Sequence, residues 1–253
     1  MPKLLASLGI AHLAFVLWTS SPSVAQTGAS FSLHWDAVPQ ATRGRGGCDV
    51  VIYLQGRSSE TTIQSQPPLV MRRLAGRLEA RLARITWPSG VDLVQEASAT
   101  IDFVRAQVDE LRRQGHQCIL VAGSSRGGWL AIKVAQEVAG IDELLAIAPQ
   151  TDGLTVAESE RHTREIATML AATRASSVAL LFGEPRDVTD LKRAEAVRIA
   201  LLNASVSFVI EERAEGLSAH GAMSPDRFSR RYLNCLSEFF GSSALPSGEQ
   251  DCD

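Results

Sequence analysis

The segment from Cys118 to Val138 constrains the fold more than any other part of the chain. It begins with a short apolar run, Cys118 to Ala122, which is typical of a buried strand. A Gly-x-Ser-x-Gly motif follows directly, with Ser125 at its centre between Gly123 and Gly127. After the motif, apolar residues recur at helical spacing, at Leu130, Ala131, Val134, Ala135 and Val138. The segment is therefore predicted to be a strand, a tight turn and a helix.

This arrangement gives Ser125 a chemical role. A sharp turn holds its hydroxyl clear of the sheet, and the small residues Gly123 and Gly127 let strand and helix pack closely. The N-terminus of the helix directs backbone amides toward developing negative charge. By itself the motif is also compatible with a phosphate-binding turn or a simple connection, so the rest of the chain must decide. The neighbouring Ser124 is expected to point into the turn and to be structural.

Strands and helices alternate along the rest of the chain. Six predicted strands are apolar without alternation, as expected for a parallel sheet covered by helices on both faces. They span Asp49–Leu54, Leu82–Trp87, Cys118–Ala122, Glu143–Ala148, Ser177–Phe182 and Val206–Glu211, which is expected to be the last strand. Phe31–Val38 is a candidate edge strand. The other predicted helices are Pro67–Glu79, Ser98–Gln114, Val156–Thr173, a helix from a Thr189 cap to Asn203, and Arg227–Phe240.

Three candidate catalytic groups follow strand ends, where the loops of a parallel sheet form a site. They are Ser125, an acidic loop at 184–187 and His220. The order of serine, acid and histidine, together with the Gly-x-Ser-x-Gly turn, resembles the α/β-hydrolase superfamily over roughly residues 48–240. The resemblance implies an α/β fold with a mostly parallel sheet of about six to eight strands and helices on both faces. The family's usual sheet has eight strands and only six are clear here, so the first hairpin is expected to be either reduced or not recognisable from the sequence.

The resemblance also assigns roles. Ser125 would be the nucleophile, His220 the general base that takes its proton, and Asp187 the acid that orients the imidazole. Rivals for the acid are Glu184, Asp190 and Asp152. The other histidines, His12, His34, His116 and His162, all precede the acidic loop.

Backbone amides are expected to form the oxyanion hole. One donor is Arg126, directly after the nucleophile. The other comes from Gln55-Gly56-Arg57, as the amide of Gly56, Arg57 or Ser58, where the family often has His-Gly-Gly. The Arg126 side chain either reaches toward an acidic substrate or contacts solvent or a nearby carboxylate.

The first 25 residues resemble a secretory signal. Lys3 supplies a positive start, Leu4–Trp18 is uncharged and apolar, and Ser23-Val24-Ala25 suits cleavage after Ala25. The alternative is an uncleaved membrane anchor. Residues 26–253 are then expected to form a single domain, exported to the periplasm or the medium.

Export permits disulfides, and the chain has four cysteines. Cys48 and Cys118 each stand at the start of a predicted strand, so they can meet at one end of the sheet if the two strands are neighbours. Cys235 in the last helix and Cys252 in the tail can staple the C-terminus. Four cysteines allow three pairings, and the sequence does not choose among them.

The sequence therefore predicts a serine hydrolase that acts on carboxylic esters without metal or organic cofactor. A single helix is predicted between Ala148 and Ser177, where the family often inserts a cap, so an open site without a cap domain is expected. A net charge of −3 without a long basic run argues against nucleic acid, and no stable membrane partner is expected. A peptidase, an acyltransferase or a non-catalytic binding protein on the same fold are the alternatives.

Overall fold

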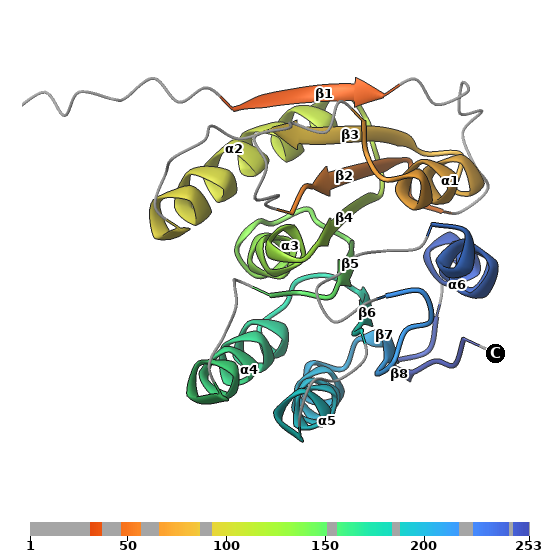
Figure 1. Ribbon diagram of the computed structural model, residues 1–253. Coiled ribbons are helices and arrows are strands. Elements are labelled where there is room, and N and C mark those ends of the chain that lie inside the picture. Colours follow the sequence, from red (N-terminus) through yellow and green to blue (C-terminus); the bar gives the residue numbers. More distant parts are fainter. Residues whose placement is uncertain are drawn as a thin grey trace, which may run out of the picture.

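An eight-stranded sheet organises the chain in the computed structural model (Figure 1). The structure describes residues 31–36, 47–56, 66–86, 93–150, 156–183, 188–217, 225–242 and 245–252. The predicted signal segment, residues 1–25, lies outside them. The order of strands across the sheet is β1-β3-β2-β4-β5-β6-β7-β8. Their bounds are β1 Ser32–Asp36, β2 Val50–Leu54, β3 Arg81–Thr86, β4 Ile119–Ser124, β5 Glu143–Ile147, β6 Ser177–Leu181, β7 Ser207–Glu211 and β8 Gly248–Glu249.

The six strands predicted from apolar runs are β2 to β7, and neighbours among them all pair in parallel. The candidate edge strand is also confirmed: β1 lies at the edge of the sheet and pairs antiparallel with β3. The mostly parallel α/β sheet expected from the resemblance is therefore present.

Helices cover both faces of the sheet (Figure 1). Side chains of α1 (Leu69–Arg77) and α6 (Pro225–Gly241) pack with one face. Side chains of α2 (Leu93–Arg113), α3 (Arg126–Glu137), α4 (Val156–Ala171) and α5 (Val188–Ala204) pack with the other. Two apolar clusters result, one on each side, which explains why the central strands carry apolar residues at consecutive positions.

Three predictions about the elements are wrong in detail. Glu211 does not end the last strand, because β8 follows α6 and pairs in parallel with β7. Helix α2 begins at Leu93, about a turn before the predicted Ser98, and α5 begins at Val188, so Thr189 lies inside the helix instead of capping it.

Between β5 and β6, where a cap domain could be inserted, α4 is the one helix among the described residues. Residues 151–155 of this segment are not among those that the structure describes.

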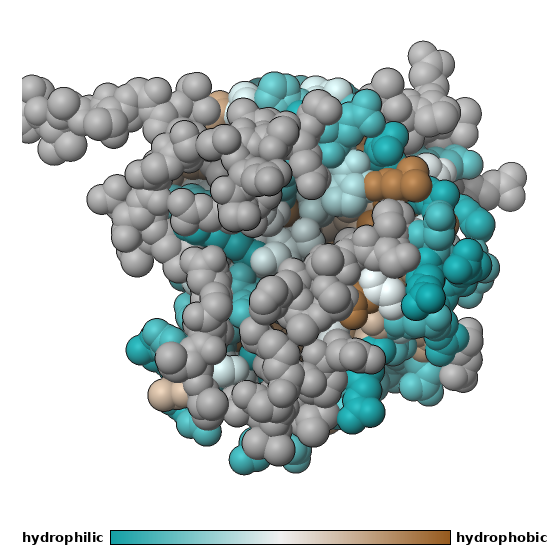
Figure 2. All heavy atoms as spheres, in the orientation of Figure 1, coloured by the Kyte–Doolittle hydropathy of each residue, from teal (hydrophilic) through white to brown (hydrophobic). Residues whose placement is uncertain are grey.

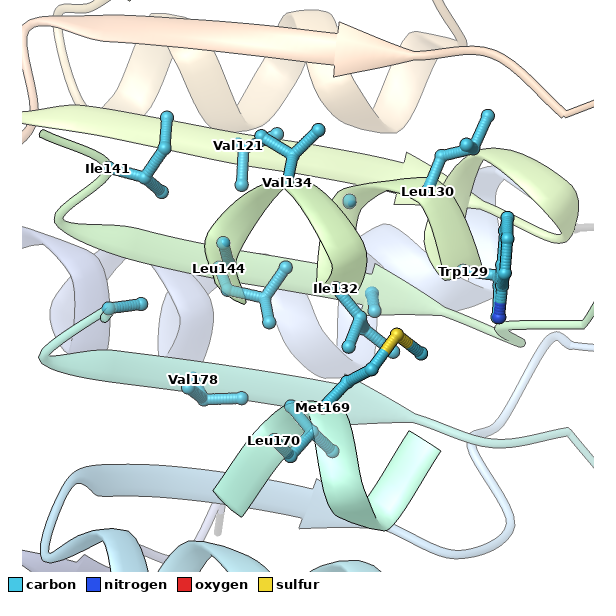
Figure 3. Packing of buried hydrophobic residues seen from close by; sticks show 14 of the residues in the cluster. Val121, Trp129, Leu130, Ile132, Val134, Ile141, Leu144, Met169, Leu170 and Val178 are labelled. Carbon is cyan, nitrogen blue, oxygen red and sulfur yellow. The ribbon is translucent and has the colours of Figure 1, made fainter. Parts of the chain in front are cut away.

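The larger cluster is centred on α3 (Figure 3). Ile132 and Val134 of this helix lie over Val121, Leu144 and Val178 of the strands β4, β5 and β6, and all five side chains are fully buried. Fully burying an aliphatic side chain contributes about 1.5–3 kcal/mol. The packing therefore fixes α3, and with it the turn that opens α3, on the central strands.

Hydrophilic side chains cover the outer surfaces of α6 and α4 in the view of Figure 2. This is the expected complement of helices whose apolar stripes face the sheet. Within the part of the chain that the structure describes, none of the helices combines the length and the apolar character that a membrane span requires.

Both expected disulfides are present, Cys48–Cys118 and Cys235–Cys252. The first joins the residues before β2 and β4, and the second ties the tail after β8 to α6. The two pairs are those inferred from where the predicted strands begin and from the last helix.

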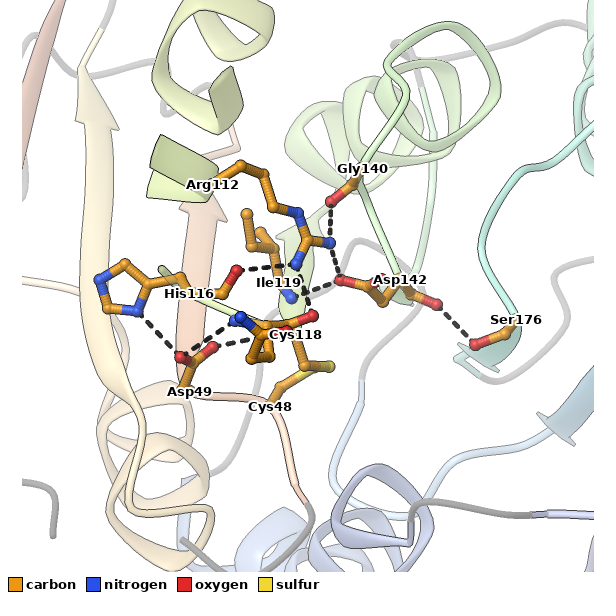
Figure 4. The surroundings of a disulfide bond; sticks show 10 residues. Cys48, Asp49, Arg112, His116, Cys118, Ile119, Gly140, Asp142 and Ser176 are labelled. Atoms are coloured by element: carbon orange, nitrogen blue, oxygen red, sulfur yellow. Dashed lines mark hydrogen bonds and ion pairs between the residues drawn. A yellow bond between two sulfur atoms is a disulfide. The ribbon is translucent and has the colours of Figure 1, made fainter. Parts of the chain in front are cut away.

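The amino end of the sheet is held by Arg112, at the end of α2 (Figure 4). Its guanidinium donates to the carbonyls of His116 at 2.9 Å and Gly140 at 2.7 Å, and to the carboxylate of Asp142. The same carboxylate accepts the backbone amide of Ile119 at 2.7 Å. The guanidinium therefore sets the positions at which β4 and β5 begin.

Arg112→Met keeps the apolar stem but removes every one of these donors. We expect it to lower the free energy of unfolding by about 2–3 kcal/mol, because charge-assisted hydrogen bonds are lost together. Chemical denaturation measures the change. Arg105→Ala on the same helix is the matched control: its exposed ion pair with Asp102 predicts a loss below about 0.5 kcal/mol. Equal losses in the two variants would contradict this account of Arg112.

Candidate active site

Ser125 occupies the turn between β4 and α3 in a strained backbone conformation. Its φ is 52° and its ψ is −125°, a region that residues other than glycine rarely adopt. Its amide donates to the carbonyl of Ile147 at 2.9 Å, and its carbonyl accepts the amides of Trp129 at 3.1 Å and Gln150 at 3.2 Å. The side chain is partly exposed and forms no capping bond to α3. The turn therefore has the strained backbone that the sequence predicted, and the residue Ser125 is partly exposed.

Glycines make this turn sterically possible. A Cβ on Gly123 would lie 2.1 Å from the carbonyl oxygen of Gly127, and a Cβ on Gly127 would lie 2.1 Å from that of Leu54. Atoms cannot approach so closely, so any side chain at either position would force the backbones apart. The predicted close packing of strand and helix around Ser125 is therefore confirmed.

Gly56, predicted as an oxyanion donor, lies against the same turn. A Cβ on Gly56 would be 3.3 Å from Cβ of Ser125 and 2.8 Å from the carbonyl oxygen of Ser124. The structure thus brings the segment after β2 beside Ser125. Arg126, the other predicted donor, is the first residue of α3, while Arg57 lies outside the described residues.

Ser124 and Ser125 have different surroundings. The hydroxyl of Ser124 shares a 2.8 Å hydrogen bond with that of Tyr53, whose side chain is buried on β2. Burial raises the pKa of Tyr53 to about 12, against the smaller opposite effect of the bond to Ser124. Tyr53 is therefore neutral, and the bond ties the end of β2 to the end of β4. The expectation that Ser124 is structural agrees with this contact.

The side chain of Arg126 forms a buried ion pair with Glu96 of α2. The guanidinium is 3% and the carboxylate 7% exposed, so neither is available to a substrate from solution. Of the two predicted roles for this side chain, contact with a nearby carboxylate is the one observed. Glu96 was not predicted as a partner of Arg126, since α2 was expected to begin after it.

The loops that carry the predicted acid and base leave the same edge of the sheet as Ser125. Strands β6 and β7 run parallel to β4, and backbone bonds continue the pairing past their ends, from Ala148 to Leu181 and from Phe182 to Glu211, each at 2.7 Å. Asp187, its rivals Glu184 and Asp152, and His220 lie outside the described residues, as does the side chain of Asp190. Their roles stay predictions.

The other described histidines have partners elsewhere. His34, on the edge strand, bonds the hydroxyl of Ser32, and Nδ1 of His116 lies 2.9 Å from Asp49 before β2. His162 is buried on α4, 3.6 Å from Glu165. Burial lowers its pKa, as does the nearby Arg193. None of the three follows the end of a strand.

The described residues contain one group of three side chains with the geometry of metal ligands, Cys48, Cys118 and Glu143. It lies at the opposite edge of the sheet from Ser125, and two of its members form a disulfide.

Gly127→Ala tests the steric account of the turn. We expect it to lower the free energy of unfolding by about 3 kcal/mol or more, since a backbone carbonyl cannot yield as a side chain can. Gly76→Ala in α1 is the matched control, because nothing lies within 4 Å of its added Cβ. There we expect a gain of about 0.5–1 kcal/mol from helix propensity and unfolded-state entropy. Thermal unfolding of both variants decides, and a stable Gly127→Ala protein would contradict the account.

The sequence matches no protein-family model and no curated protein sequence. The fold, in contrast, is shared with solved esterases. One from Pyrococcus furiosus is 14% identical, with 83% of this chain and 85% of that chain covered and a TM-score of 0.56. A fungal esterase from Rhizomucor miehei is 15% identical, covering 83% and 84% with a TM-score of 0.53. A thermostable esterase from Pseudomonas putida is 15% identical, covering 85% and 82% with a TM-score of 0.51. At such identities the likeness is one of fold, and the chain has the α/β-hydrolase fold.

Proposed function

We propose that the chain is a serine hydrolase that cleaves carboxylic esters through an acyl-enzyme on Ser125. The observation that carries the proposal is the strained turn, in which the residue Ser125 is partly exposed and its side chain forms no capping bond. A structural serine gains nothing from a strained backbone, whereas a nucleophile gains access to a bound carbonyl. The solved esterases of the same fold support the reaction class.

In the proposed reaction, the oxygen of Ser125 attacks the ester carbonyl while His220 takes its proton and Asp187 orients the imidazole. The carbonyl oxygen becomes an oxyanion and accepts bonds from the amide of Arg126 and from that of Gly56 or Arg57. Losing one such donor typically lowers the rate by ~10²–10³. His220 then protonates the departing alcohol, and water releases the acyl group by the same steps in reverse order.

Two described groups beside the turn offer a substrate no net charge: the guanidinium of Arg126 is neutralised by Glu96, and Tyr53 carries no charge. Peptidase and acyltransferase activities use the same groups and are separated from ester hydrolysis by the substrate panel below. Two disulfides suit an oxidising compartment, which supports the proposed export after cleavage near Ala25.

A fluorophosphonate probe tests the nucleophile. We expect the purified mature chain to be labelled and Ser125→Ala to be unlabelled, because the phosphonyl group bonds to the activated hydroxyl. Ser124→Ala is the matched control, one residue away, and should retain labelling and most activity. Mass spectrometry of the labelled peptide identifies the serine. A well-folded wild-type chain that resists the probe would refute the serine mechanism and favour a binding protein.

Activity on a panel of p-nitrophenyl esters, peptides and acyl acceptors tests the substrate class. We expect ester hydrolysis to exceed amide hydrolysis, and both Ser125→Ala and His220→Ala to lose about 10³-fold or more in kcat. Circular dichroism confirms that each variant is folded. Faster peptide cleavage, or acyl transfer faster than hydrolysis, would replace esterase by the corresponding alternative.

A further inference from the structure

Glu143, the first residue of β5, is a buried acid at the sheet edge opposite Ser125. The residue is 5% exposed, and its Oε2 has no hydrogen-bond partner among the described residues. Burial raises the pKa of Glu143 to about 9, and the neighbouring Asp142 adds to the effect. The group is therefore a protonated carboxylic acid at neutral pH. The esterase chemistry proposed above does not use it.

The disulfide Cys48–Cys118 is its neighbour. Both sulfur atoms and a carboxylate oxygen of Glu143 all lie within 4.8 Å of one another. The sheet produces this cluster, because β2, β4 and β5 are adjacent. Cys48 lies two residues before β2, and Cys118 directly precedes β4. In the sheet register, Glu143 of β5 is paired with Leu120 of β4. Cys118 lies two residues before Leu120, so the side chains of Cys118 and Glu143 lie on the same face of the sheet.

The charged residues labelled at this edge in Figure 4 already have partners. Asp142 pairs with Arg112, and Asp49 with His116. Helix α6 covers this face with Phe239 and Phe240, and β6 contributes the neutral Ser177 opposite Glu143. Among the described residues, Glu143 is thus the acid placed to exchange a proton with the sulfur atoms.

The two cysteines differ in burial. Residue Cys48 is fully buried, whereas residue Cys118 is partly exposed. Of the two, Cys118 lies nearer solvent, so the exchange is assigned to attack on its sulfur, with Cys48 as the leaving group. A thiolate on Cys48 would be a buried charge without a partner, which is energetically costly.

We propose that Cys48, Cys118 and Glu143 form a thiol–disulfide exchange site for dithiols, in which Glu143 protonates the sulfur of Cys48 as the disulfide opens.

The step balances as follows. One thiolate of a dithiol bonds to Sγ of Cys118, and the electron pair of the broken bond passes to Sγ of Cys48, which takes the proton of Glu143. The second thiol of the reductant, as thiolate, attacks its own first sulfur and releases Cys118, which is protonated from water. The dithiol leaves as a disulfide, and the carboxylate of Glu143 regains a proton from solvent. Two electrons and two protons have moved from the dithiol to the cysteines.

Glu143→Gln tests the role of the proton. The amide has the size and neutrality of the protonated acid, so we expect the fold to be kept. The full mature chain is reduced by dithiothreitol between about pH 6 and 10, and trapped thiols are assigned by peptide mass spectrometry. With rates expressed per dithiothreitol thiolate, we expect at least about a tenfold fall in reduction of Cys48–Cys118. The wild-type rate should also fall above the pKa of about 9, whereas the variant should show no such step.

The second disulfide supplies the internal control. The rate of reduction of Cys235–Cys252 should be the same in the wild type and in Glu143→Gln. The cluster that contains Glu143 includes Cys48 and Cys118 but neither cysteine of this second disulfide. Equal rates and pH profiles for Cys48–Cys118 in the two proteins would overturn the proposal. Faster reduction of Cys48–Cys118 in the variant would also overturn the proposal, because that result would mean that Glu143 has a structural role and donates no proton. Should the variant fail to fold, the wild-type pH profiles of the two disulfides, compared within one molecule, still decide.

Discussion

The strained backbone conformation of Ser125 is the constraint around which the structure is built. This conformation is possible only because three strands, β2, β4 and β5, meet at the turn. A strained residue of this kind costs about 1–3 kcal/mol and persists when its surroundings over-determine it. Here Ser125 is hydrogen-bonded to the carbonyl of Ile147, at the end of β5, and to the amide of Gln150 just after it. Gly127 packs directly against the carbonyl of Leu54, at the end of β2. The strands on either side of β4 are therefore required for the turn at Ser125 as well as for the core.

The opposite edge of the sheet complements this constraint. The disulfide Cys48–Cys118 fixes the starts of β2 and β4 relative to each other, and Arg112 with Asp142 fixes β5 beside them. Parallel strands of five or six residues that begin in register also end in register. Covalent and ionic contacts at one edge thus determine where Gly56, Ser125 and Gln150 arrive at the other.

The sequence was sufficient for the parts of the fold that local patterns encode. Six parallel strands were predictable since each is a continuous apolar run between turn residues. Strand β8 was not, because Gly248–Glu249 has no apolar pattern and pairs only through the backbone bonds of β7. The pairs Tyr53–Ser124 and Glu96–Arg126 join residues 71 and 30 positions apart, so only the tertiary structure brings them together. The turn at Ser125 was predictable because its glycines are steric requirements visible in the sequence itself.

The same reasoning distinguishes Glu143 from two other buried polar residues, Arg126 and Tyr53. Arg126 is balanced by Glu96, and Tyr53 by Ser124, so each is explained by its partner. Glu143 faces an apolar cluster where an aliphatic residue would pack without the cost of burying a carboxyl, and its register neighbour Leu120 shows what that face accommodates. A buried acid that lowers stability persists where its proton is of use, and the reactive group beside it is the disulfide. The two edges of one sheet then carry different reactive groups. At one edge backbone hydrogen bonds hold Ser125, and at the other Glu143 is placed to give its proton to the disulfide Cys48–Cys118.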